Sequence, residues 1–413
     1  MVMKFQCRFC NCSNGTTFAD LGMSPVSNDF VPVDQAESME PFFPLHAIVC
    51  NECFLVQLGG FDSPDRLFRD DYAYFSSYSE SWLRHAKKYA DEAIAREGLN
   101  GGSIVVEVAS NDGYLLRWFK DEGVPVIGVE PTANTAKVAL EVHGIESEVS
   151  FFGKETALAM RERGVQADLM AANNVLAHVP DLNDFVSGYP ILLKRGGVAN
   201  FEFPHLLKLM EQKQFDTIYH EHYSYLSFHF VSRLFEAHAM RVYDVEELDT
   251  HGGSLRIYVC HADDSARPQS DRARAMLVTE SAAGLEDVRT YENFSRVPTE
   301  VKCDLLDFLV SAYRDGKTVA AYGAPAKGNT LLNFCGVKSD LIAFTVDRSP
   351  HKQGKLLPGT RIPVLAPDAI SEEKPDFLLI LPWNLKCEIM EQMSVIRSWG
   401  GKFVTPIPNV AIL

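Results

Sequence analysis

The sequence predicts a three-part α/β protein, in which a small cysteine-rich module precedes two units of alternating strands and helices. Four cysteines fall into two C-x-x-C pairs close to the amino terminus. Strand-like and helical segments alternate from residue 104 onward, and the same alternation starts again at residue 301. A chain of 413 residues is also too long for one core. We therefore expect a module over residues 1–70, a second unit over 71–265 and a third over 266–413.

Composition and charge restrict the class of protein. The chain carries 39 basic and 55 acidic residues, and this net charge of −16 disfavours a nucleic-acid partner. The amino terminus lacks the apolar core of a signal peptide, and no apolar run is long enough to cross a bilayer. We expect a cytoplasmic protein that binds a small molecule and neither nucleic acid nor membrane. No heptad or apolar stripe specifies an oligomeric state, and a monomer agrees with the pattern.

The two cysteine pairs predict a structural zinc site. Their sequences are "CRFC" and "CNEC", and their thiols belong to Cys7, Cys10, Cys50 and Cys53. A two-residue gap lets one tight turn direct two thiolates at one ion, and two such turns complete a tetrahedral four-sulfur shell. A closed shell leaves no position for water or substrate, so the zinc would take no part in catalysis. Buried free thiols and a redox pair are the alternatives, but no thioredoxin-like strand, turn and helix surrounds either pair.

The second unit is expected to begin with a helix and a buried strand. Residues 79–97 are amphipathic behind a serine, and the β-branched run from Ile104 to Val108 is typical of a buried parallel strand. The turn "ASNDG" then leads to "VPVIGVEP", a second strand that ends at Glu130. An acid in that place can bind the ribose hydroxyls of a nucleoside. Alternatively, Glu130 merely begins the next helix, where an acid is favoured.

Two more strands and a hairpin complete the second unit. The third strand, in "ADLMAANNVLAHVPD", leads to Asn173, Asn174 and His178, and "GGVANFEFP" supplies the fourth. Two strands follow in "MRVYDVEELDTHGGSLRIYVCH", joined by a turn at Gly252 and Gly253. A hairpin that closes an otherwise parallel sheet is typical of a methyltransferase and not of a dehydrogenase.

The third unit repeats the pattern of the second. Residues 301–323 show a helix, a polar break and a strand, and this alternation predicts a second Rossmann-like unit. The turn "GAPAKGNTLLNF" combines small residues with Lys327 and Asn329 and can hold a phosphate at a helix start, although it is no Walker A loop. Arg348 lies in a basic loop that suits a diphosphate. The alternatives are an ordinary strand-to-helix turn and a solvated loop.

The segment "IYHEHYSYLSFHF", from Ile218 to Phe230, concentrates groups that can carry protons. A helical zinc-protease motif needs histidines four residues apart, whereas His220 and His222 are only two apart. An acid/base role is therefore the stronger hypothesis, with His222 as the general base because imidazole titrates near neutral pH. The alternative is a loop or helix end rich in interface aromatics.

Together, "EVASNDG", "NNVLAHVPD", "IYHEHYSYLS" and "HGGSLR", preceded by the two cysteine pairs, resemble the S-adenosylmethionine-dependent sugar C-methyltransferases. That family methylates C3 of nucleotide-linked 4-ketohexoses in the synthesis of branched deoxysugars. The resemblance spans nearly the whole chain. One departure concerns the usual G-x-G loop, because Ala109 and Asn111 stand where glycine is expected and only Gly113 remains.

The motifs and the resemblance together imply a class I methyltransferase domain, a second Rossmann-like domain that binds a nucleotide sugar, S-adenosylmethionine as methyl donor and structural zinc. The implied catalytic residues are His222, Glu221, Tyr219, His178 and Tyr74. The implied S-adenosylmethionine-binding residues are Glu107, Ala109, Asn111, Asp112, Gly113, Glu130, Asn173 and Asn174. The implied substrate-binding residues are Tyr72, Tyr78, His220, Ser224, Lys327, Asn329 and Arg348. Three other histidines are expected to be structural, namely His205, His229 and His251, with contact between His251 and the pocket as the alternative.

The expected reaction transfers a methyl group to C3 of a dTDP-linked 4-keto-6-deoxysugar through an enolate formed by a histidine base. A carbon next to a ketone becomes nucleophilic once its proton is removed, so the protein must supply a base and donors for the enolate oxygen. Two alternatives stay open at this point. One is an O- or N-methyltransferase of nucleotide sugars, and the other is a non-enzymatic zinc-knuckle scaffold that binds nucleotides.

Overall fold

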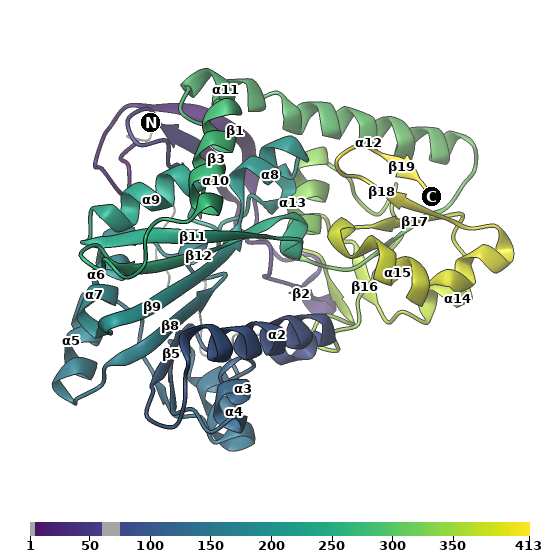
Figure 1. Ribbon diagram of the computed structural model, residues 1–413. Helices are drawn as coiled ribbons and strands as arrows, with labels where there is room; N and C mark the ends of the chain where they lie inside the picture. The colour runs from purple at the N-terminus through teal and green to yellow at the C-terminus, as the bar shows by residue number, and fades with distance from the viewer. Residues whose placement is uncertain (1–4, 60–74) are drawn as a thin grey trace.

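The computed structural model describes residues 5–59 and 75–413, and within these residues the strands form three sheets (Figure 1). The sheets have four, seven and eight strands. Both larger sheets are built mainly of parallel strands and are flanked by helices, as expected for an α/β protein. The predicted fold class is therefore confirmed.

The seven-stranded sheet has the topology of a class I methyltransferase. Its strands are β5 (Val105–Val108), β6 (Val126–Val129), β7 (Ser147–Glu148), β8 (Ala167–Asn173), β9 (Leu193–Pro204), β11 (Met240–Leu248) and β12 (Ser254–His261). Their order is β11-β12-β9-β8-β5-β6-β7. β12 runs antiparallel to both of its neighbours, whereas β9, β8, β5, β6 and β7 are parallel. The predicted hairpin is thus present, and its second strand is inserted beside β9.

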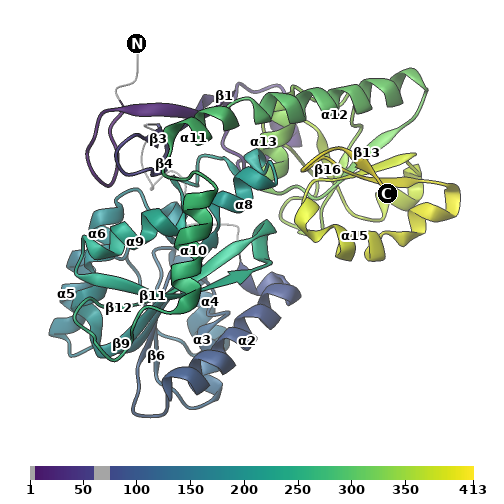
Figure 2. The same cartoon turned by 45° about the horizontal axis from the view of Figure 1, so that its top comes forward.

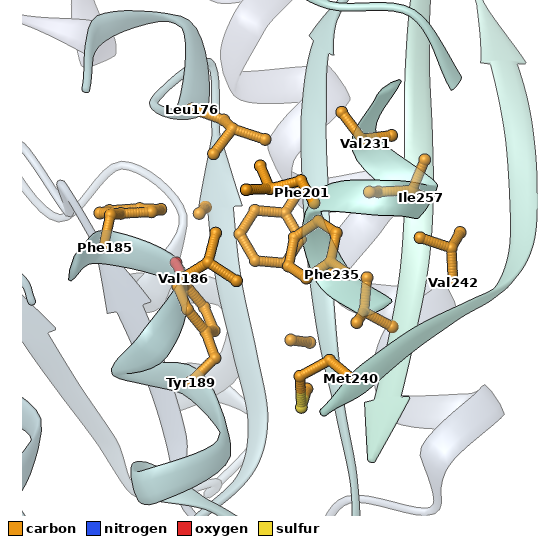
Figure 3. Close-up of a cluster of buried hydrophobic side chains, with 14 of the residues drawn as sticks. Leu176, Phe185, Val186, Tyr189, Phe201, Val231, Phe235, Met240, Val242 and Ile257 are labelled. Atoms are coloured by element: carbon orange, nitrogen blue, oxygen red, sulfur yellow. The ribbon is translucent and has the colours of Figure 1, made fainter. Parts of the chain in front are cut away.

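Helices cover both faces of this sheet, because successive strand residues point to opposite sides. Val105 and Leu169 pack toward one group of helices, which is α2 (Glu80–Glu97), α3 (Leu116–Asp121) and α4 (Ala133–His143). Val106 and Met170 pack toward the other group, which is α5 (Lys154–Glu162), α6 (Leu182–Ser187), α7 (Tyr189–Leu192), α9 (Phe228–Glu236) and α10 (Asp271–Ala282). Figure 3 shows the centre of the second core, where Phe201 and Phe235 lie together.

The predicted helix over residues 79–97 is α2. Its first turn is capped by Ser79, whose hydroxyl accepts a hydrogen bond from the backbone of Trp82 at 3.3 Å. It ends at Gly98, which has a φ of 64° that favours glycine. Alanines and Tyr89 on the inner face of α2 are buried against the sheet.

The eight-stranded sheet forms the second Rossmann-like unit. Its strands in order are β19 (Ala411–Ile412), β18 (Lys402–Thr405), β17 (Phe377–Ile380), β13 (Val319–Tyr322), β14 (Thr345–Val346), β16 (Pro363–Leu365), β15 (Lys355–Leu356) and β2 (Val31–Pro32). The five central strands, β18 to β16, are parallel. The helices of this unit are α12 (Val297–Arg314), α13 (Ala326–Cys335), α14 (Ala369–Glu373) and α15 (Lys386–Gln392).

The amino-terminal segment belongs to two sheets at once. The four-stranded sheet contains β1 (Gly15–Ser24), β3 (Phe43–Cys50), β4 (Val56–Leu58) and β10 (Ser224–Tyr225). β10 comes from the predicted acid/base segment and pairs with β4, while β2 pairs with β15 of the eight-stranded sheet. Strand pairing therefore crosses the expected boundary at residue 70, and the three-domain division stays a prediction.

Helices near the second expected boundary also link the units. α10 packs on β11 of the seven-stranded sheet, α11 (Val288–Phe294) contacts β1, and α8 (Leu206–Glu211) lies near the start of the acid/base segment. Figure 2 shows α11 and α12 crossing from the amino-terminal strands to the carboxyl-terminal unit. Over residues 5–59 and 75–413, no helix combines the length and the hydropathy that crossing a bilayer requires.

Candidate active site

The four predicted zinc ligands lie together. The sulfur atoms of Cys7, Cys10, Cys50 and Cys53 are all within 4.8 Å of one another. Cys7 Sγ is 3.4 Å from Cys53 Sγ, and Cys10 Sγ is 3.5 Å from Cys50 Sγ. Sulfurs bound tetrahedrally to zinc at about 2.3 Å are separated by roughly 3.8 Å. The cluster therefore fits a structural zinc ion.

Both cysteine turns have the same backbone conformation. Asn11 and Phe54 each stand four residues after the first cysteine of their pair, and their φ angles are 60° and 61°. Their backbone N–H groups donate to the carbonyls of Cys7 and Cys50, each at 3.0 Å. The sequence gives a signal for Asn11, because asparagine tolerates positive φ, but none for Phe54.

The zinc-binding turn contacts the acid/base segment. The guanidinium of Arg8 lies 4.9 Å from the ring centroid of Tyr223. The backbone N–H of Arg8 donates to the side chain of Gln57, a residue of β4 that pairs with Ser224 of β10. Displacement of the zinc-binding turn would therefore displace the acid/base segment, through the pairing of β4 with β10 and the cation–π contact of Arg8 with Tyr223.

The predicted S-adenosylmethionine-binding loop follows β5, and its backbone is left-handed even where glycine is absent. Ala109 and Asn111 have φ angles of 56° and 49°, and Gly113 has a φ of 80°. The loop thus keeps the left-handed backbone that glycine usually supplies, at two positions where the side chain makes it costly. At Gly113 a Cβ would lie 2.9 Å from the side chain of Ile145, so this glycine is required by packing.

Glu130 holds this loop from the end of β6. One of its oxygens accepts the backbone N–H of Asn111 at 2.8 Å, and the other accepts the backbone N–H of Thr132 at 2.8 Å. The hydroxyl of Thr132 also contacts this carboxylate. Glu130 is therefore bonded to its own surroundings at the start of α4, and its predicted contact with ribose stays a prediction.

Polar side chains around the loop fit a polar ligand. Among the described residues, the side-chain oxygens of Asn173 and Asn174 at the end of β8, and Oδ1 of Asp112, are buried with no hydrogen-bond partner. Buried polar atoms without partners are uncommon in folded proteins. Glu107 is fully buried in β5, and burial raises its pKa well above the ordinary value. These residues have capacity for the hydrogen bonds of S-adenosylmethionine.

The tautomer of His222 follows from its contacts. His222 Nδ1 lies 2.9 Å from the carbonyl oxygen of Thr217. Because a carbonyl only accepts, Nδ1 must carry the proton, which leaves the lone pair on Nε2. The ring is half-buried, and burial holds its pKa well below 6.5, with His178 and Lys327 acting in the same direction. His222 is therefore a neutral base at neutral pH.

Three predicted residues surround this imidazole. The ring centroid of Tyr219 lies 4.0 Å from that of His222, and the centroid of His178 lies 4.7 Å away. His178 Nδ1 faces the carbonyl oxygen of Glu221 at 2.8 Å. Burial lowers the pKa of His178 to about 4. The structure thus brings His222, His178, Tyr219 and Glu221 together, as the sequence predicts.

The carboxylate of Glu221 is bonded to a residue from the amino-terminal segment. Nδ2 of Asn28 lies 2.8 Å and 3.0 Å from the two oxygens of Glu221. Glu221 is 7% exposed, and burial raises the pKa of its carboxyl while the contact with Asn28 opposes that rise. Asn28 lies outside every motif of the sequence, so no local pattern indicates this contact.

Lys327 reaches the same site from the carboxyl-terminal unit. Its Nζ donates to Oδ1 of Asn384 at 2.6 Å and lies 4.2 Å from the ring centroid of Trp383. Trp383 in turn donates its indole N–H to Asp216 at 2.7 Å. Burial lowers the pKa of Lys327 to about 8 and raises that of Asp216 to about 6, and each charge partly offsets the shift of the other.

His251 is a further histidine near this group. Its φ is 56°, and its ring packs edge-on against Trp82 at 5.5 Å. The charges of Lys327 and Glu202 act on its pKa, which burial lowers to about 4. The neighbouring Gly252 has no room for a side chain, because a Cβ would lie 2.7 Å from Trp383. The turn at His251 and Gly252 therefore lies against Trp383, the ring that Lys327 contacts.

Other predicted substrate residues have different surroundings. His220 lies against β3, with Nε2 facing the carbonyl of Pro44 at 3.2 Å, and Ser224 is buried in β10. The amide of Asn329 donates to the carbonyl of Ser27 at 2.9 Å. Their substrate roles stay predictions.

Two other predicted substrate residues, Tyr78 and Arg348, lie on the surface. Tyr78 is 63% exposed and stacks in parallel with His351 at 6.4 Å, and Arg348 is exposed. Tyr72 and Tyr74 lie outside the described residues.

Comparison with known families covers nearly the whole chain. Residues 7–68 match a family model described as a zinc binding domain, residues 82–243 match a methyltransferase domain, and residues 249–408 match a C-methyltransferase C-terminal domain. The C-methyltransferase NovU of Streptomyces niveus is 36% identical over 410 residues, which is 99% of this chain and 96% of that protein.

Partial matches are weaker. A ubiquinone biosynthesis O-methyltransferase of Chelativorans sp. (strain BNC1) is 30% identical over 98 residues, which is 24% of this chain and 38% of that protein. Among solved structures, the PH0226 protein of Pyrococcus horikoshii OT3 aligns with 49% of this chain and 100% of that chain, at 16% identity and a TM-score of 0.37. Such low similarity carries no argument about activity. The full-length relative and the three matched models show that the chain belongs to the S-adenosylmethionine-dependent C-methyltransferases with an amino-terminal zinc-binding domain.

Proposed function

We propose that this C-methyltransferase transfers a methyl group to C3 of a dTDP-linked 4-keto-6-deoxyhexose, with His222 as the base that removes the C3 proton. The proposal depends most on one observation, the 2.9 Å contact between His222 Nδ1 and the Thr217 carbonyl. This contact fixes the neutral tautomer and directs the basic Nε2 away from the main chain. The sugar class rests on the resemblance of the motifs to the sugar C-methyltransferases.

The surrounding residues suit formation of an enolate. A carbonyl adjacent to C3 makes the C3 hydrogen acidic, and the enolate oxygen then needs donors that stabilise its charge. Tyr219, whose ring centroid lies 4.0 Å from that of His222, is the candidate donor for this role. S-adenosylmethionine, when bound, supplies an electrophilic methyl group.

The carboxyl-terminal unit would hold the nucleotide. Lys327 lies at the start of α13, and Arg348 follows β14. Cations beside a helix start suit a diphosphate. This arrangement would place the diphosphate on the eight-stranded sheet and the methyl donor on the seven-stranded sheet, with the acid/base segment between them.

Solvent exchange at carbon tests the proposal directly. The enzyme would be incubated in D2O with a panel of dTDP-4-keto sugars and without the methyl donor, and the sugars analysed by mass spectrometry. We expect deuterium to enter C3, and we expect a gain of one CH2 unit when S-adenosylmethionine is added. His222→Asn should abolish both signals and leave S-adenosylmethionine binding by calorimetry unchanged. Methylation without any exchange in the wild type, or full activity of His222→Asn, would show that the assigned base is wrong.

A further inference from the structure

We propose that Asn28 is a positioning residue of the acid/base segment, because its amide fixes the carboxylate of Glu221 and, through the main chain at that residue, the ring of His178. The inference rests on the proposed function. It assigns a role to a residue of the amino-terminal segment that belongs to none of the recognised motifs.

The contact itself is well defined. A carboxylate only accepts hydrogen bonds, so the amide nitrogen of Asn28 must face Glu221, and it is 2.8 Å and 3.0 Å from the two oxygens. Glu221 is 7% exposed, whereas Asn28 is an exposed residue whose side chain reaches inward. Over residues 5–59 and 75–413, Asn28 is the side chain that bonds this carboxylate. Because the carboxylate is buried, loss of this hydrogen bond would be costly.

The loop that carries Asn28 is anchored to the carboxyl-terminal unit. The carbonyl of Ser27 accepts the amide of Asn329 at 2.9 Å, and the hydroxyls of Ser27 and Thr330 are 3.4 Å apart. Asn329 and Thr330 lie in the first turns of α13, two and three residues after Lys327. The backbone at Asn28 is therefore held in place by α13, and the Asn28 side chain connects α13 to the acid/base segment.

Glu221 transmits this position to the histidines. Its carbonyl oxygen accepts the Nδ1 proton of His178 at 2.8 Å, and the ring of His178 lies 4.7 Å from that of His222. If the carboxylate moves, the peptide that orients His178 moves with it. Misplacement of catalytic groups by about 1 Å can cost on the order of 10²-fold in rate.

Three histidines of the described residues adjoin Glu221, either in the chain or through its carbonyl oxygen. They are His178, His220 and His222, and burial lowers the pKa of each, that of His178 to about 4. These rings are neutral near pH 7 and above. Lys327 beside His222 has a pKa of about 8. Lys327 titrates in the wild type and in the Asn28 variants alike, so the pH profile of wild-type kcat already contains its effect.

The test compares Asn28→Ala and Asn28→Asp with the wild type, by kcat against pH at saturating methyl donor and sugar. Asn28→Ala removes the donor, and we expect kcat to fall about 10- to 100-fold. Asn28→Asp has nearly the same shape. Two carboxyls about 3 Å apart share one proton, so at low pH the variant still donates to Glu221. As pH rises that proton leaves and the two charges repel. We therefore expect Asn28→Asp to show a new alkaline loss of kcat that the wild type lacks.

Asp29→Ala is the matched control, because Asp29 is the next residue, is exposed, and does not bond Glu221 within the described part of the chain. It should keep wild-type kcat and pH dependence. The proposal is overturned if both Asn28 variants keep the wild-type profile, or if their losses are independent of pH and follow thermal stability alone.

A substrate-free measurement separates this inference from the proposed function. The infrared carboxyl band of Glu221 is identified as the difference between wild type and Glu221→Gln. We expect Asn28→Ala to shift this band and to raise the pH at which it titrates. If the wild type acts on no 4-keto sugar but the band shifts, the proposed function fails and the contact stands. An unchanged band overturns the role of Asn28 whatever the substrate.

Discussion

The two Rossmann-like sheets hold their first loops in the same way. In the seven-stranded sheet, Val129 accepts the backbone N–H of Ala109 at 2.7 Å and Glu130 accepts that of Asn111 at 2.8 Å. In the eight-stranded sheet, the backbone N–H of Gly323 bonds Val346 at 2.6 Å, and that of Ala324 bonds Asp347 at 2.7 Å. An acid after β6 thus fixes the loop after β5, and an acid after β14 fixes the loop after β13.

The difference between them lies in the other groups on each acid. The second oxygen of Glu130 is bonded by the backbone of Thr132, which is neutral. Asp347 instead has the ammonium of Lys352 at 3.5 Å, and Lys327 lies in the first turn of α13, just beyond the loop after β13. An acid after the second strand therefore does not by itself identify a ribose site. The two loops also differ in charge, because the first contains Asp112 and the second is followed by Lys327.

The largest predicted effect concerns the zinc site of the amino-terminal segment. Cys50→Ser removes one of four zinc ligands, and β10 and β2 connect this segment to the acid/base segment and to the eight-stranded sheet. Structural zinc contributes about 10 kcal/mol or more to the folding of small zinc domains. We expect loss of bound zinc, loss of methyl transfer and aggregation or proteolysis of the amino-terminal segment. Zinc content, limited proteolysis and activity would be measured. A soluble, active and zinc-free variant would contradict the link.

The two acids give the next prediction as a matched pair. Glu130→Ala and Asp347→Ala should each cost about 1–3 kcal/mol, because each leaves a backbone N–H without its charged acceptor. The ligand effects should differ. Glu130→Ala should weaken S-adenosylmethionine binding, whereas Asp347→Ala should raise the KM for the nucleotide sugar and leave donor binding unchanged. Calorimetry with each ligand would check this, and equal effects of both variants on both ligands would remove the distinction between the sheets.

Lys327→Met tests the cationic loop with a smaller expected effect. The KM for the nucleotide sugar should rise about tenfold, which corresponds to about 1.4 kcal/mol. The charge of Lys327 also helps to keep the pKa of His222 low. Without it that pKa rises, so the acid limb of kcat/KM should move to higher pH. The wild-type limb is expected below pH 6.5, because His222 must be neutral to act as base. A pH profile of both enzymes, with Lys338→Met as an exposed control, would measure the shift.

Local chemistry explains what the sequence could predict. Each C-x-x-C pair needs only one turn, and the buried strands are continuous apolar runs, so both are visible in short windows. The acid/base group was predictable because His222, Glu221 and Tyr219 share one segment. His178 required the resemblance, since it lies in a different segment, in the short 3-10 helix after β8.

Contacts between distant segments could not be predicted. Asn28 and Glu221 are separated by 193 residues, and nothing near either one specifies the other. The same holds for β10, which pairs with β4 of the amino-terminal segment, and for Trp383, which bonds Asp216. The contact of Asp347 could not be predicted either, because the backbone N–H that it accepts is set by folding and leaves no sequence pattern.

The smallest predicted effect concerns the loop in which alanine replaces glycine. Ala109 has a φ of 56°, a conformation that costs a non-glycine residue about 1–2 kcal/mol, while glycine loses about 0.5–1 kcal/mol more entropy on folding. Ala109→Gly should therefore stabilise the loop by less than about 1 kcal/mol and change the Kd for S-adenosylmethionine by less than about threefold. Ala109→Val should weaken binding far more, because a β-branched residue disfavours this φ. Calorimetry of the three proteins would rank them. If Ala109→Gly binds S-adenosylmethionine tenfold more weakly, the methyl group of Ala109 contacts the ligand. Gly323 occupies the same place in the eight-stranded sheet, so the two loops would then differ in this side-chain contact as well as in charge.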